Sequence, residues 1–122
     1  MKATFEIKEA ARGKYMFNLK SANDQVILTS QTYDSKESVK VGIASVRKNS
    51  ALDERYEAKT GGDGRPYFVL IAANRQVIGR SQMYSSPEAM RKGIASVKRN
   101  SPNAETVDSS PRVRSAGGGS GA

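Results

Sequence analysis

The chemistry open to this 122-residue chain is narrow, because the sequence contains neither cysteine nor histidine. Disulfides, thiolate and imidazole metal sites, cysteine nucleophiles and histidine-dependent triads are therefore excluded. Carboxylates, lysines, tyrosines and hydroxyls remain, and no catalytic, metal-binding or cofactor-binding constellation stands out among them. We therefore predict a protein that is not an enzyme and that needs no cofactor.

Two carboxylates and two tyrosines recur at matching places along the chain. Glu6 and Glu57 could work as an acid–base pair if their surroundings separated their pKa values. A lysine follows each of them two residues later on the same strand face, so we interpret both as parts of a solvated ion-pair face. Tyr33 and Tyr84 could contact a ligand, but we interpret each ring as a cap on the edge of the core with its hydroxyl in water.

Basic side chains offer a binding function. The net charge is +8, and the basic surplus of each half of the chain lies in residues 35–50 and 86–101. If a pseudo-two-fold axis brought these segments together, they would form a pad that binds nucleic-acid phosphates weakly and without reading sequence. The alternative is a solvated surface that keeps a small protein soluble. The candidate nucleic-acid contacts are Lys40, Arg47, Lys48, Arg91, Lys98 and Arg99.

Protein interaction is a second class of binding function. One predicted strand carries methionine, asparagine and lysine on its polar face in the first half of the chain, but larger apolar residues replace them in the second half. An exposed apolar patch of this kind is typical of a partner or self-association surface. The candidate protein contacts are Tyr67, Val69 and Ile71.

An internal repeat determines how these residues are positioned. Adding 51 to a residue number in the first half gives its counterpart in the second half without a gap; residues 25–27 match 76–78, and residues 42–46 match 93–97. One further step of 51 from the first strand reaches residues 106–108, a partial third copy of that strand.

We therefore predict a single domain over residues 1–108 that consists of two repeats, about 4–54 and 55–108. Residues 109–122 have the composition of a Gly/Ser-rich linker and are predicted to be disordered.

Each repeat predicts three strands and a helix. Apolar and polar residues alternate over residues 5–8 and 15–20, and residues 26–31 read as a third strand. Turn residues follow the second strand of each repeat. Asn23 with Gln25, and Asn74 with Gln76, could form a polar pocket, but we interpret them as hairpin-turn residues.

The segment after the third strand is predicted to be helical. Val39, Ile43 and Val46 recur at helical spacing and form an apolar stripe. Gly42 and Gly93 lie at the margin of the stripe in their repeats, although glycine inside a helix costs about 1 kcal/mol relative to alanine. We interpret them as marking a close approach of the helix to the sheet or to its twin helix, with a hinge as the alternative.

Capping residues predict where the helices begin and end. Asp34 and Ser85 each precede a glutamate by three residues, which is typical of a helix start. Asn49 and Asn100 stand where a left-handed C-terminal cap is expected.

The runs 30–35 and 42–49, repeated at 81–84 and 93–100, resemble the signature of the YegP-like family. These are small bacterial proteins built on a domain of unknown function, often in tandem. The resemblance implies a pseudo-two-fold molecule in which two β-β-β-α-β units share an antiparallel sheet and exchange their last strands. It implies no activity, so no site residues follow from it. The chain departs from the family's usual Asn-Gly turn at Asp24 and Arg75, and we expect the turn to survive.

The predicted fold class is α+β, with two tandem β-β-β-α(-β) repeats sharing one antiparallel sheet and two helices on one face. No apolar run approaches the roughly 20 residues of a membrane helix, and the N-terminus has no signal-peptide core. We therefore expect a cytoplasmic protein with no membrane partner, a monomer that forms an internal pseudo-dimer. Its partners are otherwise unknown.

Overall fold

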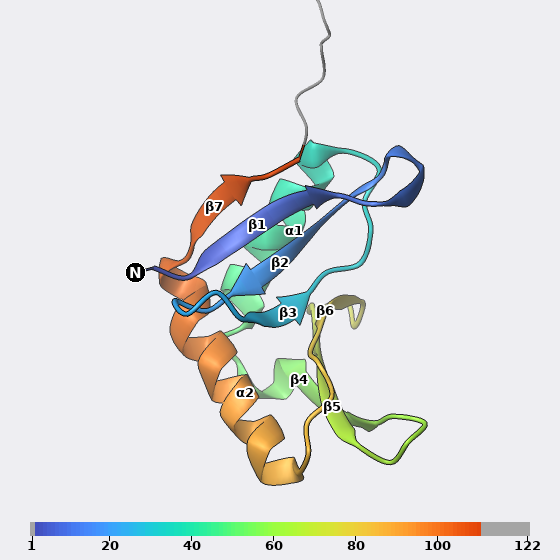
Figure 1. The fold of residues 1–122 in the computed structure, drawn as a ribbon, viewed down its shortest axis with the longest axis vertical. Coiled ribbons are helices and arrows are strands. Elements are labelled where there is room, and N and C mark those ends of the chain that lie inside the picture. The colour runs from blue at the N-terminus through green and yellow to red at the C-terminus, as the bar shows by residue number, and fades with distance from the viewer. Residues whose placement is uncertain (1, 111–122) are drawn as a thin grey trace, which may run out of the picture.

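The computed structural model describes residues 2–110; each repeat contributes three strands and one helix, and a seventh strand follows the second helix (Figure 1). A short 3-10 turn lies between the first two strands, and one follows each helix. The elements are β1 (Thr4–Glu9), η1 (Ala11–Gly13), β2 (Tyr15–Lys20), β3 (Val26–Thr29), α1 (Lys36–Asn49), η2 (Asp53–Arg55), β4 (Tyr56–Thr60), β5 (Pro66–Ile71), β6 (Val77–Arg80), α2 (Pro87–Asn100), η3 (Ser101–Asn103) and β7 (Glu105–Asp108).

The strands form one seven-stranded sheet in the order β4-β5-β6-β3-β2-β1-β7. At its centre β3 and β6 run antiparallel, and Thr29 pairs with Arg80, its own counterpart 51 residues later. An antiparallel pair of equivalent residues places the pseudo-two-fold axis at this point. The predicted α+β fold class, with two tandem repeats that share one sheet, is confirmed.

The sheet is mixed, so the expectation of a wholly antiparallel sheet is wrong at one edge. β7 pairs with β1 in parallel, from Thr4 opposite Glu105 to Ile7 opposite Asp108. By the repeat, β7 is equivalent to β4, which follows α1 and pairs antiparallel with β5 of the other repeat. The corresponding place beside β2 is already taken by β1. β7 keeps its direction but moves one strand outwards, and it therefore runs parallel to β1.

One apolar core lies between the sheet and the two helices. Each helix contacts strands of both repeats, α1 against β2 and β6, and α2 against β5 and β3. Figure 1 shows α1 behind β1 and β2, with α2 beside the other half of the molecule. The largest fully buried apolar side chains are Phe5, Ile7, Phe17, Leu19, Leu28, Val39, Val46, Phe68, Leu70 and Val97.

The core is asymmetric next to the pseudo-two-fold axis, where Leu28 of the first repeat corresponds to Gly79 of the second. A Cβ placed on Gly79 would lie 2.6 Å from Cδ2 of Leu28 and 2.7 Å from its Cγ. These distances are too short for any side chain. One leucine therefore fills space that two equivalent leucines could not share.

Both helices begin one residue later than predicted. The N-cap residues are Ser35 and Ser86, and each hydroxyl accepts a hydrogen bond from the backbone N–H three residues further on, at 3.1 Å. The predicted caps, Asp34 and Ser85, stand just outside. Asp34 pairs instead with Lys14, and this hydrogen-bonded ion pair lowers the pKa of the Asp34 carboxyl.

The prediction of left-handed C-terminal caps is wrong. Asn49 and Asn100 are the last residues of their helices, and each Nδ2 donates to the carbonyl oxygen four residues earlier, at 2.9 and 2.8 Å. The chain continues in right-handed geometry through Ser50 (φ −64°) and Ser101 (φ −59°). The asparagines therefore bond back into the last helical turn.

Left-handed residues occur instead in the hairpin turns. Asp24 and Arg75 both have φ +70°, the region that favours glycine. In the first turn, the Ser21 backbone N–H donates to the Gln25 carbonyl at 2.8 Å, and the Ser21 carbonyl accepts from the Asp24 N–H at 2.9 Å. The turn therefore survives without the family's glycine, as expected, with a strained residue at this position.

Residues 2–110 contain no helix that is long and apolar enough to cross a membrane. Ser109 and Ser110, which were assigned to the disordered tail, continue from β7, and the Ser109 N–H donates to the Ile7 carbonyl at 2.9 Å. The rest of the predicted tail, residues 111–122, lies outside the described residues.

Candidate functional site

The recurring carboxylates are held in separate ion pairs. Glu6 Oε1 lies 3.1 Å from Lys20 Nζ, and the Ser109 hydroxyl donates to Glu6 Oε2 at 2.7 Å. The hydrogen bonds from Ser109 and Lys20 lower the pKa of Glu6. Glu57 pairs with Lys59 at 3.5 Å, so the predicted ion-pair face is found there, whereas the partner of Glu6 comes from β2. Within residues 2–110, no cluster of three or more acidic side chains could hold a metal ion.

The recurring tyrosines explain the helix glycines. The Tyr33 ring stacks on Phe17 with centroids 6.4 Å apart, and a Cβ on Gly42 would overlap its hydroxyl. Tyr84 stands in the same way over Gly93. The predicted close approach is confirmed, but the partner is a tyrosine. Both tyrosines are half-buried, and this burial raises the pKa of each hydroxyl.

Two of the six candidate nucleic-acid contacts make structural bonds. Arg47 donates through Nη1 to the Ser101 carbonyl and through Nη2 to Thr106 Oγ1, both at 3.2 Å, while its guanidinium lies 4.8 Å from the centre of the Phe5 ring. It thereby ties α1 to β7. The equivalent Lys98 of α2 pairs with Asp53 after α1.

The other four members of the predicted pad, Lys40, Lys48, Arg91 and Arg99, are exposed. Within residues 2–110, none of them has a carboxylate within ion-pair distance. Their role in nucleic-acid binding remains a prediction.

The predicted apolar patch on β5 is wrong as an exposed surface. Val69 and Ile71 are only 5% and 4% exposed, and the Arg80 guanidinium lies 4.8 Å above the ring of Tyr67. β5 lies between β4 and β6, and Val69 has Glu57 on one side and Arg80 on the other as cross-strand neighbours. Long charged side chains can cover apolar residues in this way, which the strand sequence alone did not indicate.

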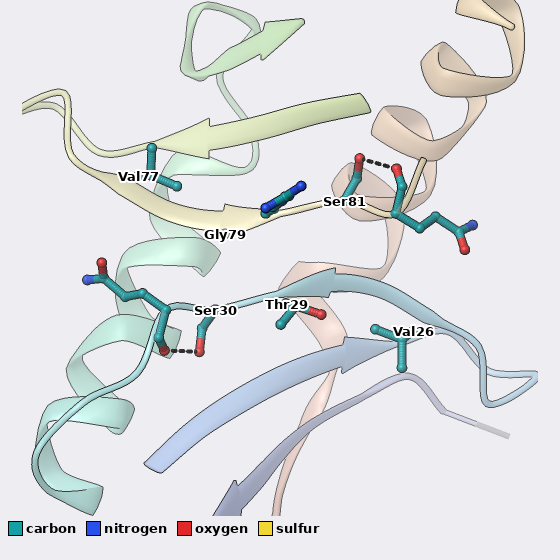
Figure 2. A pocket seen from close by; sticks show the side chains of 9 residues that line it. Val26, Thr29, Ser30, Val77, Gly79 and Ser81 are labelled. Carbon is teal, nitrogen blue, oxygen red and sulfur yellow. Dashed lines mark hydrogen bonds between the residues drawn. The ribbon is translucent and has the colours of Figure 1, made fainter. Parts of the chain in front are cut away.

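A hollow of about 540 Å³ follows the seam between the repeats on β3 and β6. Figure 2 shows Val26 and Val77 at opposite ends of this hollow, with Gly79 across from Ser30 between them. Arg80 is the one charged residue that lines it, and this side chain is engaged with Tyr67. The sequence analysis did not predict this hollow.

The two serine hydroxyls in the seam hollow already make hydrogen bonds within the protein. Ser30 Oγ accepts from the Phe17 N–H at 2.9 Å and donates to the Gln31 carbonyl at 2.7 Å. Ser81 repeats both bonds at 2.9 and 2.8 Å, and Figure 2 marks the two donated bonds. These serines therefore stabilise the end of the third strand in each repeat and have no hydroxyl proton left for a ligand.

The hairpin-turn asparagines act mainly on their own turns. Asn74 Oδ1 accepts from the Gln76 N–H at 3.0 Å, the bond expected of an Asx turn. Each turn also borders a shallow hollow beside the helix of the other repeat. The interpretation of Asn74 and Gln76 as turn residues is therefore confirmed.

A different hollow lies beside the free edge of the sheet. Within residues 2–110, β4 has a neighbouring strand, β5, on one side only. Next to it is a hollow of about 390 Å³ between the strand and α2. Its lining residues are Asp53, Tyr56, Ala58, Arg91, Ile94, Ala95 and Lys98.

The same position at the other end of the sheet is filled. β7 lies on the outer side of β1 (Figure 1), and β1 is the repeat equivalent of β4. At this end of the sheet, Phe5, Ile7 and Ile43 are 0%, 1% and 3% exposed. Their counterparts at the open end are the half-buried Tyr56 and Ile94 and the exposed Ala58. The hollow beside β4 thus lies at the edge that is equivalent to the one where β7 pairs with β1.

The sequence carried two signals for this hollow. The partial third copy at residues 106–108 covers one sheet end only, and Phe5 and Ile7 are replaced by a tyrosine and an alanine in the second repeat. Both signals became interpretable only with the strand order, because the sequence does not show which strand lies at the edge.

Comparison with known sequences identifies the repeat unit. The sequence model of a domain of unknown function, DUF1508, matches residues 10–57 and 62–108. Each match begins after the first strand of the repeat and ends in the strand that follows the helix. The UPF0339 protein YegP of Escherichia coli K12 is 50% identical over 100 residues, which cover 82% of this chain and 91% of that protein. A UPF0339 protein of Bordetella pertussis is 52% identical over 102 residues, covering 84% and 92%.

Two solved structures share the fold. The solution NMR structure of E. coli YegP, described as a protein of unknown function, has a TM-score of 0.84 at 46% identity and covers 90% of this chain and 95% of its own. That of the UPF0339 protein SO3888 from Shewanella oneidensis has a TM-score of 0.83 at 40% identity, covering 90% and 93%. None of these descriptions names a catalytic activity. The chain therefore belongs to the YegP-like family of DUF1508 proteins, as its motifs predicted.

Proposed function

We propose that this chain is a non-catalytic protein-interaction module that binds an extended peptide segment as an added strand on the free edge of β4. The observation that carries the proposal is the strand already bound at the equivalent edge, β7 on β1. The same molecule therefore contains both an occupied and an open version of one groove. A cytoplasmic location and a monomeric state belong to the same proposal.

Strand addition suits this edge for a general reason. The outer backbone N–H and C=O groups of an edge strand can pair with another chain, while a neighbouring hollow receives alternate side chains of the added segment. β4 is short and carries Glu57 and Lys59, features that discourage uncontrolled edge pairing. We therefore expect reversible binding of a matched segment.

Phage-displayed peptides selected against the immobilised chain would test this function. The selected peptides should shift the amide NMR resonances of residues 56–60 in β4 and of 91–98 in α2. By the repeat, Ala58 corresponds to Ile7, whose carbonyl accepts from the neighbouring Ser109 of the β7 side. Ala58→Pro should therefore remove an outward N–H and abolish binding while the fold is retained.

The matched control is Val77→Thr, which changes an exposed residue on β6, separated from β4 by β5. This variant should bind the selected peptides as the parent does. If the peptides shift resonances elsewhere in the molecule, or bind Ala58→Pro as tightly as the parent, the β4 edge is not a strand-binding site.

Weak, sequence-independent nucleic-acid binding is a second candidate function, supported by the four exposed pad residues. Changing Lys40, Lys48, Arg91 and Arg99 to Gln should lower both the affinity and its salt dependence, because each phosphate contact releases counterions. A chain ending at Ser110 removes the contribution of Arg112 and Arg114. Absence of binding by that chain at about 50 mM salt would contradict this candidate.

A further inference from the structure

The bound β7 strand shows which side chains its groove recognises. Thr106 and Asp108 both make contacts with α1, since Arg47 Nη2 lies 3.2 Å from Thr106 Oγ1 and Lys36 Nζ lies 2.9 Å from Asp108 Oδ2. Residues two apart on a strand point to the same side. The groove at the closed end therefore binds a hydroxyl through Arg47 and, two residues later, a carboxylate through Lys36.

The second repeat keeps a modified set of these cations beside the open groove. Lys98 replaces Arg47, and Pro87 stands where Lys36 would be. The next cation along α2 is Arg91, one turn later, and both Arg91 and Lys98 line the hollow. Side chains of a helix tilt towards its N-terminus, so Arg91 can serve the position that Lys36 serves in the first repeat.

The floor of the open groove is apolar. Tyr56 donates its hydroxyl to the Ser50 carbonyl at 2.7 Å, which fixes the ring, and Ile94 is only half buried. Ala58 leaves more room than Ile7 does at the closed end. Asp53 is the one acidic residue that lines the hollow, and it is paired with Lys98. The groove therefore has a net positive charge above an apolar floor.

We propose, resting on the strand-binding function above, that the partner is an acidic extended segment that binds parallel to β4. It carries Ser or Thr at one helix-facing position and Asp or Glu two residues later. The hydroxyl lies near Lys98, and the carboxylate pairs with Arg91. The parallel direction follows from the pairing of β7 with β1.

The test uses the whole chain and a synthetic peptide with the sequence of residues 103–110, which contains the Thr106 and Asp108 pair. The chain's own β7 stays on β1, because its tether gives it an effective concentration in the millimolar range. The peptide should shift the amide resonances of residues 56–60 and 91–98. A peptide with Asp108→Lys should bind about tenfold more weakly, as expected for a lost charge-assisted contact.

Arg91→Glu in the chain is the matched variant, since Arg91 is exposed and its change should leave the fold intact. This variant should bind the acidic peptide more weakly and the Asp108→Lys peptide more tightly than the parent chain does. If both peptides bind β4 equally, the acidic preference is overturned while strand binding stands. If neither the peptides nor any selected sequence shifts β4, the proposed function fails as well. Shifts confined to β1 and β7 would mean that the peptide replaces the bound strand, and would also overturn the proposal.

Discussion

The two ends of the sheet differ in a single strand, and the sequence differs accordingly. At the closed end, where β7 pairs with β1, Phe5 and Ile7 are almost completely buried. At the open end the equivalent residues are Tyr56, whose hydroxyl is bound to a backbone carbonyl, and Ala58. Both replacements reduce the apolar surface that an uncovered edge presents to water. We therefore expect the open end to be stable without a further strand and the closed end to depend on β7.

Removal of β7 should have the largest effect on this comparison. A chain ending at Asn103 should lose roughly 2–4 kcal/mol of unfolding free energy relative to a chain ending at Ser110, because Phe5, Ile7 and Ile43 become solvent-exposed. Urea denaturation measures the difference. Ala58→Pro at the open end, in the same assay, should change stability by much less. Equal stability of the two truncated chains would show that β7 does not protect the closed end.

The helix glycines test whether the repeats pack alike away from their edges. Gly42→Ala and Gly93→Ala should each destabilise the fold by about 1–3 kcal/mol, because the new Cβ overlaps a tyrosine that is stacked on phenylalanine. Thermal melts give the sign directly, because an alanine without this contact would stabilise the helix by about 1 kcal/mol. Truncating the facing ring, with Tyr33→Ala, should reverse the penalty at Gly42. A stabilised single variant would disprove the close contact.

The hairpin turns should respond unequally in the two repeats. Asp24 and Arg75 share φ +70°, but aspartate tolerates the left-handed region better than arginine does. Arg75→Gly should therefore stabilise the fold by about 0.5–1 kcal/mol, and Asp24→Gly by less. Their exposed ion pairs, with Glu57 and Lys20, offset little of this gain. Differential scanning calorimetry of both variants measures the two gains, and a larger gain for Asp24→Gly would contradict this prediction.

Acid should weaken the closed end through Asp108. Burial raises the pKa of Asp108, but hydrogen bonds from Lys36 and Ser110 outweigh it and bring the pKa to about 2. A lowered pKa contributes stability above the unfolded-state value of about 3.9, and this stability is lost as the pH falls from there through 2. Hydrogen exchange of β7 amides should accelerate over this range, by an amount worth less than about 1 kcal/mol for such an exposed pair. Asp108→Asn should remove the part of this pH dependence that is due to Asp108 and leave the part due to Glu6, whose pKa is lowered by Ser109 and Lys20. An unchanged profile would contradict the assignment.

Features that depend on repeat and periodicity were predictable from the sequence. The offset of 51 residues, the strand alternation and the helix stripe of Val39, Ile43 and Val46 gave the fold class and the close approach at Gly42. The helix starts were misplaced by one residue because two polar residues in succession can serve as a cap, and Asp34 had a partner in Lys14.

Long-range pairing was not predictable. Arg47 and Lys98 were predicted to be surface cations, because their partners lie far away in the sequence. Arg47 bonds to Ser101 after the second helix, and Lys98 pairs with Asp53 after the first. The burial of Val69 depends on strand neighbours that the sequence does not specify. The open groove at β4 likewise required the strand order, since a strand's own residues do not reveal whether a neighbour is missing.

The unequal pair at the pseudo-two-fold axis, Leu28 and Gly79, makes the halves of this chain complementary and not interchangeable. Two copies of the first half would bring two leucines into space sized for one, and two copies of the second half would leave that space empty. If the chain is divided between its two repeats, the two fragments should therefore associate as a heterodimer in preference to either homodimer. The difference between Leu28 and Gly79 thus makes each half of the repeat select the other half as its partner.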